Sequence, residues 1–372
     1  MECYLDNSAT TKPCKAAVDA EISALTELYG NPSSLHQKGV DAYMLLEKSR
    51  GTIAASLKAS PDEIYFTPCG TVSNNTAIFG AVGAKKRLGK KIVTTALEHP
   101  SVEKCMERLE ESGFEVVRVQ PQSDGNISLK DFENAIDENT ILVSVMAVNN
   151  EVGSVMPTEN LKKIIKSKNS PALLHVDDVQ GYMKIPLCPK SCGIDLMSVS
   201  AHKVHGPKGV GALYINKNVR INPYILGGGQ ENNMCSGTQG MPAIAGFAAA
   251  VENGGSVEKN LKYTAKLNLR LRERIKEIPG VHINSPENAL PYIINISIDE
   301  IPSQVSVNFF SMNGVYISAG SACSKGHSMG LQPDRIDSAI RISLSNDTSI
   351  DEIDRCADVI KIAIEKLRKH KG

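Results

Sequence analysis

Seven short apolar segments between residues 60 and 215 constrain the fold of this chain more than any other feature of its sequence. Each has the length of a β-strand, and they alternate with longer segments of helical pattern such as 101–113 and 161–168. Several are apolar throughout, which is typical of strands covered on both faces. The pattern predicts an α/β fold with a mainly parallel seven-stranded sheet and helices on either side. The predicted strands span 63–67, 91–95, 114–119, 141–146, 172–177, 195–200 and 209–215.

The last third of the chain follows a different pattern. A glycine-rich stretch at 226–240 precedes a run of small residues and then a long charged helix at 256–278. Short strands return beyond this helix, and an amphipathic helix follows them. We therefore expect a large domain at 15–250 and a smaller α+β C-terminal domain at 251–372, with residues 1–14 packing near the smaller one.

Charge and cysteine usage narrow the function class. The chain has 41 lysine and arginine residues and 41 aspartate and glutamate residues. It therefore has no net positive charge that would attract nucleic acid or an anionic membrane. No apolar stretch has the length of a membrane span, and the first residues carry acids where a signal peptide is basic. The nine cysteines are scattered, and the spacing of Cys188 and Cys192 matches no common zinc pair. We expect an enzyme or small-molecule binder of the reducing cytoplasm, without a metal.

Polar residues follow successive strands of the predicted sheet. In chain order they are Thr71, His99, Asn150, Asp177, Gln180, Ser200, His202 and Lys203. Each of them alone is more often a helix cap, a turn residue or a surface side chain. Because the carboxyl ends of parallel strands meet at one edge of a sheet, where ligands bind, we expect these side chains to surround a single site.

This set of residues matches the requirements of pyridoxal phosphate (PLP). The Gly-Thr turn at Thr71 opens a helix and offers backbone N–H groups to a phosphate. PLP also needs an acid that keeps its pyridine nitrogen protonated and a lysine that holds it covalently. Asp177 can provide the acid, and the loop 200–209, SAHKVHGPKG, offers two lysines, Lys203 and Lys208.

A series of motifs extends over nearly the whole chain, from residue 4 to about 355. They are LDNSATTKP, GNPSSLHQKG, EHPSV, VNNEVG, HVDDVQ, SVSAHKVHGPKGVGALY, GGGQENNMCSGT, SAGSACS and SAIRISL. In this order they resemble the motifs of cysteine desulfurases of the NifS/IscS type, which are class V aminotransferases. The resemblance implies a fold-type I PLP enzyme that works as a homodimer, removes sulfur from L-cysteine and leaves L-alanine.

The resemblance also implies roles for single residues. Lys203 would hold PLP and remove the substrate Cα proton, His99 would stack on the ring and shuttle a proton, and Cys323 would take the sulfur as a persulfide. Arg341, together with Asn150, would bind the substrate carboxylate. The implied cofactor-binding residues are Thr71, His99, Asn150, Asp177, Gln180, Ser200, His202, Lys203 and, from the second subunit, Thr238.

The sulfur carrier and its acceptor follow from the same resemblance. Cys323 lies in the small polar segment AGSACSKGH, where Lys325 and His327 favour a thiolate. A persulfide there would pass to an acceptor protein, either an iron–sulfur scaffold or an enzyme of tRNA or cofactor thiolation.

The chain departs from the family pattern at Val72, Asn232 and Cys235, and its segment between Cys323 and Arg341 is short. These departures leave open a PLP-binding paralogue of weak activity with a regulatory or assembly role. Selenocysteine lyase or another PLP-dependent C–S lyase is a further alternative. An aminotransferase is disfavoured because it has no use for a thiol such as Cys323.

Overall fold

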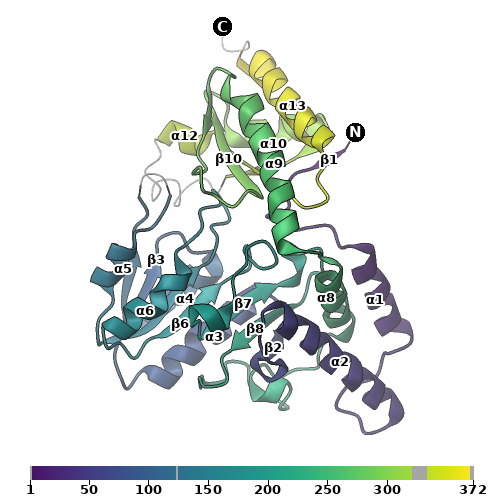
Figure 1. Ribbon diagram of the computed structural model, residues 1–372, viewed down its shortest axis with the longest axis vertical. Coiled ribbons are helices and arrows are strands. Elements are labelled where there is room, and N and C mark those ends of the chain that lie inside the picture. Colours follow the sequence, from purple (N-terminus) through teal and green to yellow (C-terminus); the bar gives the residue numbers. More distant parts are fainter. Residues whose placement is uncertain (1, 123–124, 321–332, 369–372) are drawn as a thin grey trace.

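The computed structural model describes residues 2–122, 125–320 and 333–368, which form a large unit and a smaller one (Figure 1). The large unit is built on a seven-stranded sheet of order β2-β8-β7-β6-β5-β3-β4, in which only β8 runs antiparallel to its neighbours. The predicted mainly parallel sheet is therefore confirmed. Its strands are β2 (Ile64–Thr67), β3 (Lys91–Thr95), β4 (Glu115–Val119), β5 (Thr140–Met146), β6 (Leu173–Asp177), β7 (Leu196–Ser200) and β8 (Gly211–Ile215).

Successive residues of the central strands face opposite sides of the sheet, and each side packs against its own helices. Leu142 and Leu196 pack with residues of α3 and α4, whereas their neighbours Val143 and Met197 pack with residues of α2, α5, α6 and α8. Both faces of the sheet are buried, which explains why these strands are continuously apolar. The helices are α2 (Gln37–Ser56), α3 (Gly70–Lys85), α4 (Pro100–Glu111), α5 (Leu129–Ala135), α6 (Thr158–Ser167), α7 (Pro189–Cys192) and α8 (Met241–Asn253).

Helix α4 shows how local sequence places a polar side chain at the sheet edge. His99 is its N-cap, and the His99 side chain accepts a hydrogen bond from the backbone N–H of Ser101. Pro100 occupies the first helical position, where its missing N–H costs nothing. Beyond the last turn Gly113 adopts a φ of 84°, a left-handed conformation that ends helices readily. The helix therefore starts at Pro100 with His99 as its N-cap, a few residues after the end of β3.

The smaller unit has its own core. Its four-stranded sheet has the order β12-β13-β10-β9 and is antiparallel, and Cys3 and Leu5 from the start of the chain belong to its core. Helix α9 (Val257–Lys276) runs from the large unit into this one (Figure 1). Since α8 packs in the first core and α9 in the second, we propose the domain boundary near residue 250, as predicted. The other elements are β1 (Cys3–Tyr4), β9 (Val281–Ile283), β10 (Ile293–Ile298), α10 (Ser303–Met312), β11 (Val315–Tyr316), β12 (Ser318–Ala319), α12 (Pro333–Asp337), β13 (Ala339–Ser343) and α13 (Ile350–Arg368).

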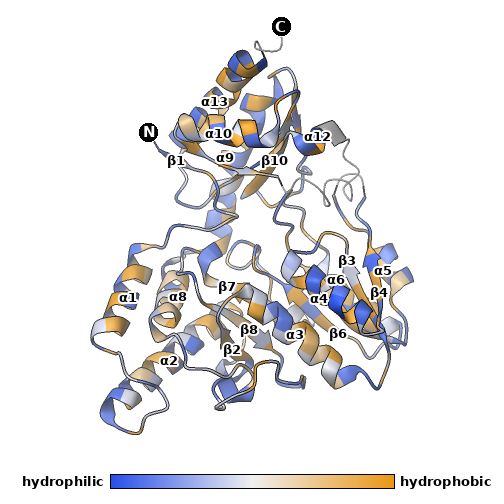
Figure 2. Cartoon of the chain, turned by 180° about the vertical axis from the view of Figure 1, so that it is seen from behind, coloured by the Kyte–Doolittle hydropathy of each residue, from blue (hydrophilic) through white to orange (hydrophobic). Residues whose placement is uncertain are grey.

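Two N-terminal helices were not predicted from the sequence. Helix α1 (Lys15–Thr26) and α2 pack on α8, yet both expose large apolar side chains, including Leu25 and Met44, each 63% exposed. Figure 2 shows hydrophobic and hydrophilic residues mixed around both helices. Because apolar residues lie on their outward faces as well, neither helix has a clear two-sided pattern. Within the part of the chain that the structure describes, none of the helices combines the length and apolar character needed to cross a membrane.

A buried ion pair anchors the glycine-rich loop 226–240 to α2. The backbone at Glu231, Asn232 and Asn233 is left-handed, with φ angles of 49°, 52° and 67°. The Glu231 carboxylate accepts hydrogen bonds from Arg50 Nη1 at 2.7 Å, from Arg50 Nη2 at 3.1 Å and from the Phe66 backbone N–H at 2.8 Å. Non-glycine residues adopt such a conformation only where surrounding contacts hold them in it. We infer that the Arg50–Glu231 pair holds this loop.

Replacing Arg50 by methionine is expected to destabilise the protein substantially. The Arg50→Met variant leaves the carboxylate of Glu231 buried without its cation, so the free energy of unfolding should fall by about 3 kcal/mol in urea denaturation. Lys104→Met serves as the control, because Lys104 and Glu107 form an exposed pair and its loss should cost at most about 0.5 kcal/mol. Equal effects of the two changes would contradict an anchoring role for Arg50.

Candidate active site

A cavity of about 430 Å³ lies at the carboxyl ends of the parallel strands. It is formed by the turns after β2, β3, β5, β6 and β7, together with β13 of the smaller unit and the segment Ser8–Ala9. The cavity thus collects side chains from distant parts of the sequence, as the order of the strands predicts. The sequence-predicted residues that line it are Thr71, His99, Asn150, Asp177, Gln180, Ser200, His202, Lys203 and Arg341.

Other predicted residues do not line this cavity. Thr238 is exposed in the loop 226–240 and is not part of the cavity wall within this single chain. Cys323 lies outside the described residues, together with Lys325 and His327. Lys208 is exposed and does not line the cavity, so Lys203 is the lysine of the loop 200–209 that faces it.

One end of the cavity has the features of a phosphate site. The N-terminus of α3 opens there at Gly70, and a Cβ at this position would lie 2.9 Å from Cγ2 of Val179 and 3.5 Å from Cβ of Ser200. The Ser200 hydroxyl is buried without a hydrogen-bond partner among the described residues. Burial and then the charge of Lys203 lower the pKa of His202 to about 4, so its imidazole is neutral at neutral pH. Helix N–H groups, a free hydroxyl and a neutral imidazole are suited to bind a phosphate.

The middle of the cavity presents an oriented carboxylate. Asp177 ends β6, and its Oδ2 accepts a hydrogen bond from Asn74 Nδ2 at 2.8 Å, while its Oδ1 accepts one from the Val179 backbone N–H at 3.0 Å. Asn74 also donates to Ser101 Oγ at 2.9 Å. These bonds fix the plane of the carboxylate, as the acid partner of a pyridinium nitrogen requires.

Lys203 is a partly buried amine with a lowered pKa. It follows β7 in the short helix η2 (Ala201–Lys203), and its Nζ donates to the carbonyl oxygens of Ser8 and of Ala9, the latter at 2.8 Å. Burial and then the Arg341 guanidinium lower the pKa of Lys203 to about 8. A minor fraction of the amine is therefore unprotonated near neutral pH, and this form can act as a nucleophile or base.

His99 is held with a defined tautomer. Its Nδ1 accepts from the backbone N–H of Ser101 at 3.1 Å and lies 2.8 Å from Ser101 Oγ. Because Nδ1 acts as acceptor, the neutral ring carries its proton on Nε2. His99 is thus fixed as an acid or hydrogen-bond donor at the wall of the cavity.

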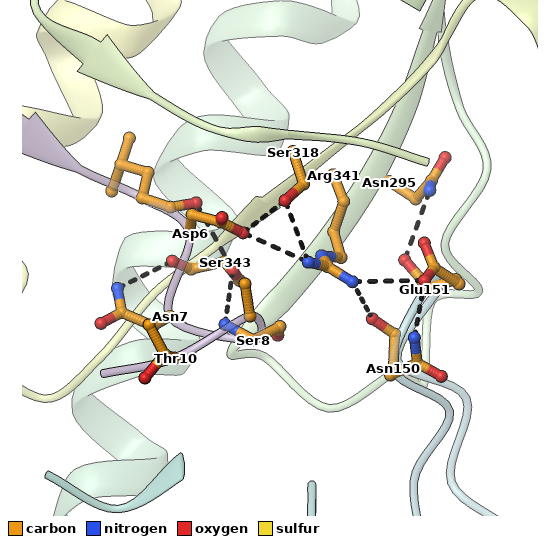
Figure 3. Close-up of polar contacts among 12 residues, drawn as sticks. Asp6, Asn7, Ser8, Thr10, Asn150, Glu151, Asn295, Ser318, Arg341 and Ser343 are labelled. Atoms are coloured by element: carbon orange, nitrogen blue, oxygen red, sulfur yellow. Dashed lines mark hydrogen bonds and ion pairs between the residues drawn. The ribbon is translucent and has the colours of Figure 1, made fainter. Parts of the chain in front are cut away.

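Arg341 enters the cavity from β13 with its guanidinium group surrounded by acceptors (Figure 3). Its Nη1 donates to the Asn150 carbonyl oxygen at 3.0 Å and lies 3.3 Å from Oε1 of Glu151. Its Nη2 lies 3.2 Å from both Asp6 Oδ1 and Ser318 Oγ. The guanidinium group is thus a fixed, buried cation that faces the same cavity as Lys203.

These features fit PLP as a ligand. The donors at Gly70 and Ser200 suit its phosphate, Asp177 suits its pyridine nitrogen and Lys203 suits its aldehyde. Unpartnered amide oxygens of Gln180 and Asn150 also lie buried along the wall. Their lack of partners among the described residues is typical of a site shaped around a polar ligand.

Comparison with known proteins agrees with this geometry. The chain matches the aminotransferase class-V family over residues 3–356. It is 36% identical to a cysteine desulfurase, IscS of Methanosarcina thermophila, over 98% of this chain and 92% of that protein.

The chain belongs to the class-V aminotransferase family.

Solved structures of the family have the same fold. A NifS-like protein superposes with a TM-score of 0.94 at 38% identity, covering 98% of this chain and 100% of that chain. SspA, solved in complex with cysteine, superposes with a TM-score of 0.81 at 30% identity, covering 92% of this chain and 99% of that one. Enzymes of this family use PLP, which is the cofactor of this chain as well.

The sequence did not indicate several residues that hold the site together. Asn74 orients Asp177, and it lies one helical turn after Gly70, so the helical period from the Gly-Thr turn points to it. Asp6 and Glu151 contact Arg341, but no local pattern marks them, because their contacts join segments far apart in the sequence.

The departures from the family pattern in the loop 226–240 do not add a second reactive thiol. Cys235 is buried, and burial followed by the charge of Glu231 raises the pKa of its thiol. A buried thiol of raised pKa is a poor nucleophile. The structure therefore favours an inert Cys235 over one that carries sulfur.

The pKa of Lys203 leads to a pH prediction. Only the unprotonated amine combines with the PLP aldehyde, so the rate at which apoprotein takes up PLP should rise with pH and level off above about pH 8. Removing the neighbouring cation in an Arg341→Gln variant raises the pKa of Lys203, and the midpoint should move to higher pH. Stopped-flow absorbance of PLP binding measures both curves. An unchanged midpoint in the variant would disprove the electrostatic effect of Arg341 on Lys203.

Proposed function

We propose that this chain is a PLP-dependent cysteine desulfurase that converts L-cysteine to L-alanine and carries the sulfur as a persulfide on Cys323. The observation that carries the proposal is that Lys203, Asp177 and Arg341 face one cavity. An amine for the cofactor aldehyde, an acid for its ring and a guanidinium for a carboxylate together define a site for an amino acid bound to PLP. The full-length similarity to a cysteine desulfurase and to a protein solved with cysteine supports cysteine as the substrate.

The cofactor roles divide among the cavity residues. Thr71, Ser200 and His202 would hold the phosphate with the N-terminus of α3, and Asp177 would pair with the pyridine nitrogen. His99, Gln180 and Asn150 would contact the rest of the ring and its substituents. When bound, PLP supplies an electron sink for the bond that breaks at the substrate Cα.

The residues around the cofactor then handle the substrate. Arg341 binds the carboxylate and thereby fixes which substituent of Cα faces Lys203. The Lys203 Nζ, which is partly unprotonated near neutral pH, removes the Cα proton. His99 Nε2 exchanges a proton with the substrate thiol, since its Nδ1 already accepts from Ser101.

Sulfur leaves through Cys323. The Cys323 thiolate attacks the substrate sulfur, so an S–S bond forms while the Cβ–S bond breaks and its electron pair stays with the carbon. That carbon is protonated and becomes the methyl group of alanine. One cysteine and one protein thiol therefore give one alanine and one persulfide, and the reaction needs no external oxidant.

The persulfide step is tested with Cys323→Ser. We expect the variant to bind PLP normally but to form alanine from L-cysteine at least roughly hundredfold more slowly, as is usual when a catalytic nucleophile is removed. Alanine is measured by amino-acid analysis, and protein persulfide by alkylation and mass spectrometry. Cys235→Ser is the control and should leave the rate unchanged. Alanine formation at the unaltered rate in Cys323→Ser would exclude this mechanism.

The proposed function includes an oligomeric state and a sulfur acceptor. The chain works as a homodimer of the cytoplasm and passes sulfur to a scaffold or thiolation protein. The dimer is supported by the exposed apolar faces of α1 and α2 and by Leu226, 80% exposed in the loop that carries Thr238. Apolar surface of this extent is typical of protein interfaces. In a dimer Thr238 would reach the phosphate of the partner's cofactor. The large apolar side chains exposed on α1, on the segment between the two helices and on α2 include Ile22, Leu25, Tyr29, Leu35, Tyr43 and Met44.

The dimer is tested at α1 and α2. Light scattering of the native protein should give the mass of two chains, whereas a Leu25→Glu, Met44→Glu double variant should give the mass of one, because the charges would be buried in the interface. The single chains should also lose PLP more readily, since Thr238 would no longer assist. Met312→Glu changes a methionine on α10 that is more exposed, at 86%, than Met44, and should leave the dimer intact. A monomeric native protein would refute the assignment.

A further inference from the structure

The guanidinium group of Arg341 has internal partners on both of its terminal nitrogens. Nη1 contacts the Asn150 carbonyl and Glu151, and Nη2 contacts Asp6 and Ser318 (Figure 3). Its Nε, by contrast, is buried and has no hydrogen-bond partner among the described residues. A charged donor left unpaired in a buried site is unfavourable. A ligand that pairs with Nε is therefore favoured.

The geometry of the guanidinium group indicates where a carboxylate binds. Nε and Nη2 point along one edge of the group and offer two parallel N–H donors, the arrangement that binds a carboxylate through both oxygens. Nε is unpaired, but Nη2 lies 3.2 Å from Oδ1 of Asp6. Ser318 Oγ lies at the same distance from Nη2. A substrate carboxylate on this edge must therefore take the place of one of these two partners, and Asp6 is the one whose negative charge it repels.

Asp6 is easier to displace than Glu151, the other acid beside Arg341. The Asp6 side chain is 21% exposed, whereas that of Glu151 is 8% exposed. Oδ1 of Asp6 accepts from Ser318 Oγ at 2.7 Å, and this bond can persist if the carboxylate moves away from Nη2. Glu151 is tied more firmly, since its Oε1 accepts from Asn150 Nδ2 at 2.6 Å and its carbonyl oxygen from Asn295.

We propose that Asp6 is an internal competitor for the substrate carboxylate: it occupies Nη2 of Arg341 in the absence of substrate and so sets the affinity and the carboxylate preference of the site. The inference rests on the proposed function, in which Arg341 binds the substrate carboxylate. Asp6 balances part of the charge of Arg341 in the resting enzyme, and it repels a carboxylate that approaches the same edge. Neutralising Asp6 should therefore tighten binding, whereas loss of a residue that only orients Arg341 would weaken it.

The test compares two ligands of the PLP-loaded enzyme that differ in the carboxylate. L-alanine and ethylamine both react through an amine, neither carries a thiol for turnover, and absorbance titration gives both dissociation constants. We expect Asp6→Asn to lower the dissociation constant of L-alanine about tenfold relative to that of ethylamine, the effect of a charge-assisted hydrogen bond. Any change in the pKa of Lys203 affects both ligands and cancels in the comparison.

Control variants separate this inference from the proposed function. Arg341→Gln should abolish the preference for L-alanine over ethylamine, and if it does not, Arg341 does not bind the carboxylate and that part of the proposed function fails. If Arg341→Gln abolishes the preference but Asp6→Asn leaves or raises the L-alanine constant, the competition by Asp6 alone is refuted. Asp354→Asn is the control for the loss of an aspartate that pairs with an arginine. Asp354 on α13 pairs with Arg270 on α9 at 2.7 Å, and this change should alter neither dissociation constant. Asp6→Ser provides the same comparison if Asp6→Asn binds no PLP.

Discussion

Two cations in one cavity, the partly buried Lys203 and the buried Arg341, set the main physical constraint on this structure. They come from the large and the small unit respectively, and each needs acceptors to compensate for lost water. The N-terminal segment supplies them: Asp6 contacts Arg341, and the carbonyl oxygens of Ser8 and Ala9 accept from Lys203. The same segment explains why residues before α1 pack with the smaller unit although the rest of the N-terminal half belongs to the larger one.

The N-terminal segment is itself held on both sides. The Ser343 backbone N–H in β13 donates to the Leu5 carbonyl oxygen at 2.7 Å, and the Thr11 backbone N–H donates to the His202 carbonyl oxygen at 2.8 Å. The segment therefore connects the strand that carries Arg341 with the loop that carries Lys203. A rigid connection of this kind keeps the amine and the guanidinium group at a fixed separation, as a site that positions one small amino acid requires.

The sequence predicted the frame of the site better than its internal contacts. The ends of the strands were predicted to within about two residues. A strand that is buried on both faces appears in the sequence as a continuous run of apolar residues, so its position can be read from neighbouring residues alone. Side chains at strand ends, such as Asp177 and Lys203, followed from that frame, since parallel strands end at one edge. Asp6 and Glu151 did not follow, because their contacts with Arg341 span 335 and 190 residues and leave no periodic signal. The outward apolar residues of α1 and α2 likewise obscured those helices.

Two of the departures from the family pattern, Asn232 and Cys235, lie on a loop whose backbone is anchored by other residues. Asn232 lies within the left-handed turn of the loop 226–240 and Cys235 follows it, but the ion pair of Arg50 with Glu231 holds that turn. Both positions carry uncharged side chains, and neither takes part in the Arg50–Glu231 anchor. Their effect should therefore concern the partners that approach the loop, while the cavity around Lys203 keeps its geometry. Retained cofactor chemistry with altered docking is the combination that this arrangement favours over a loss of activity.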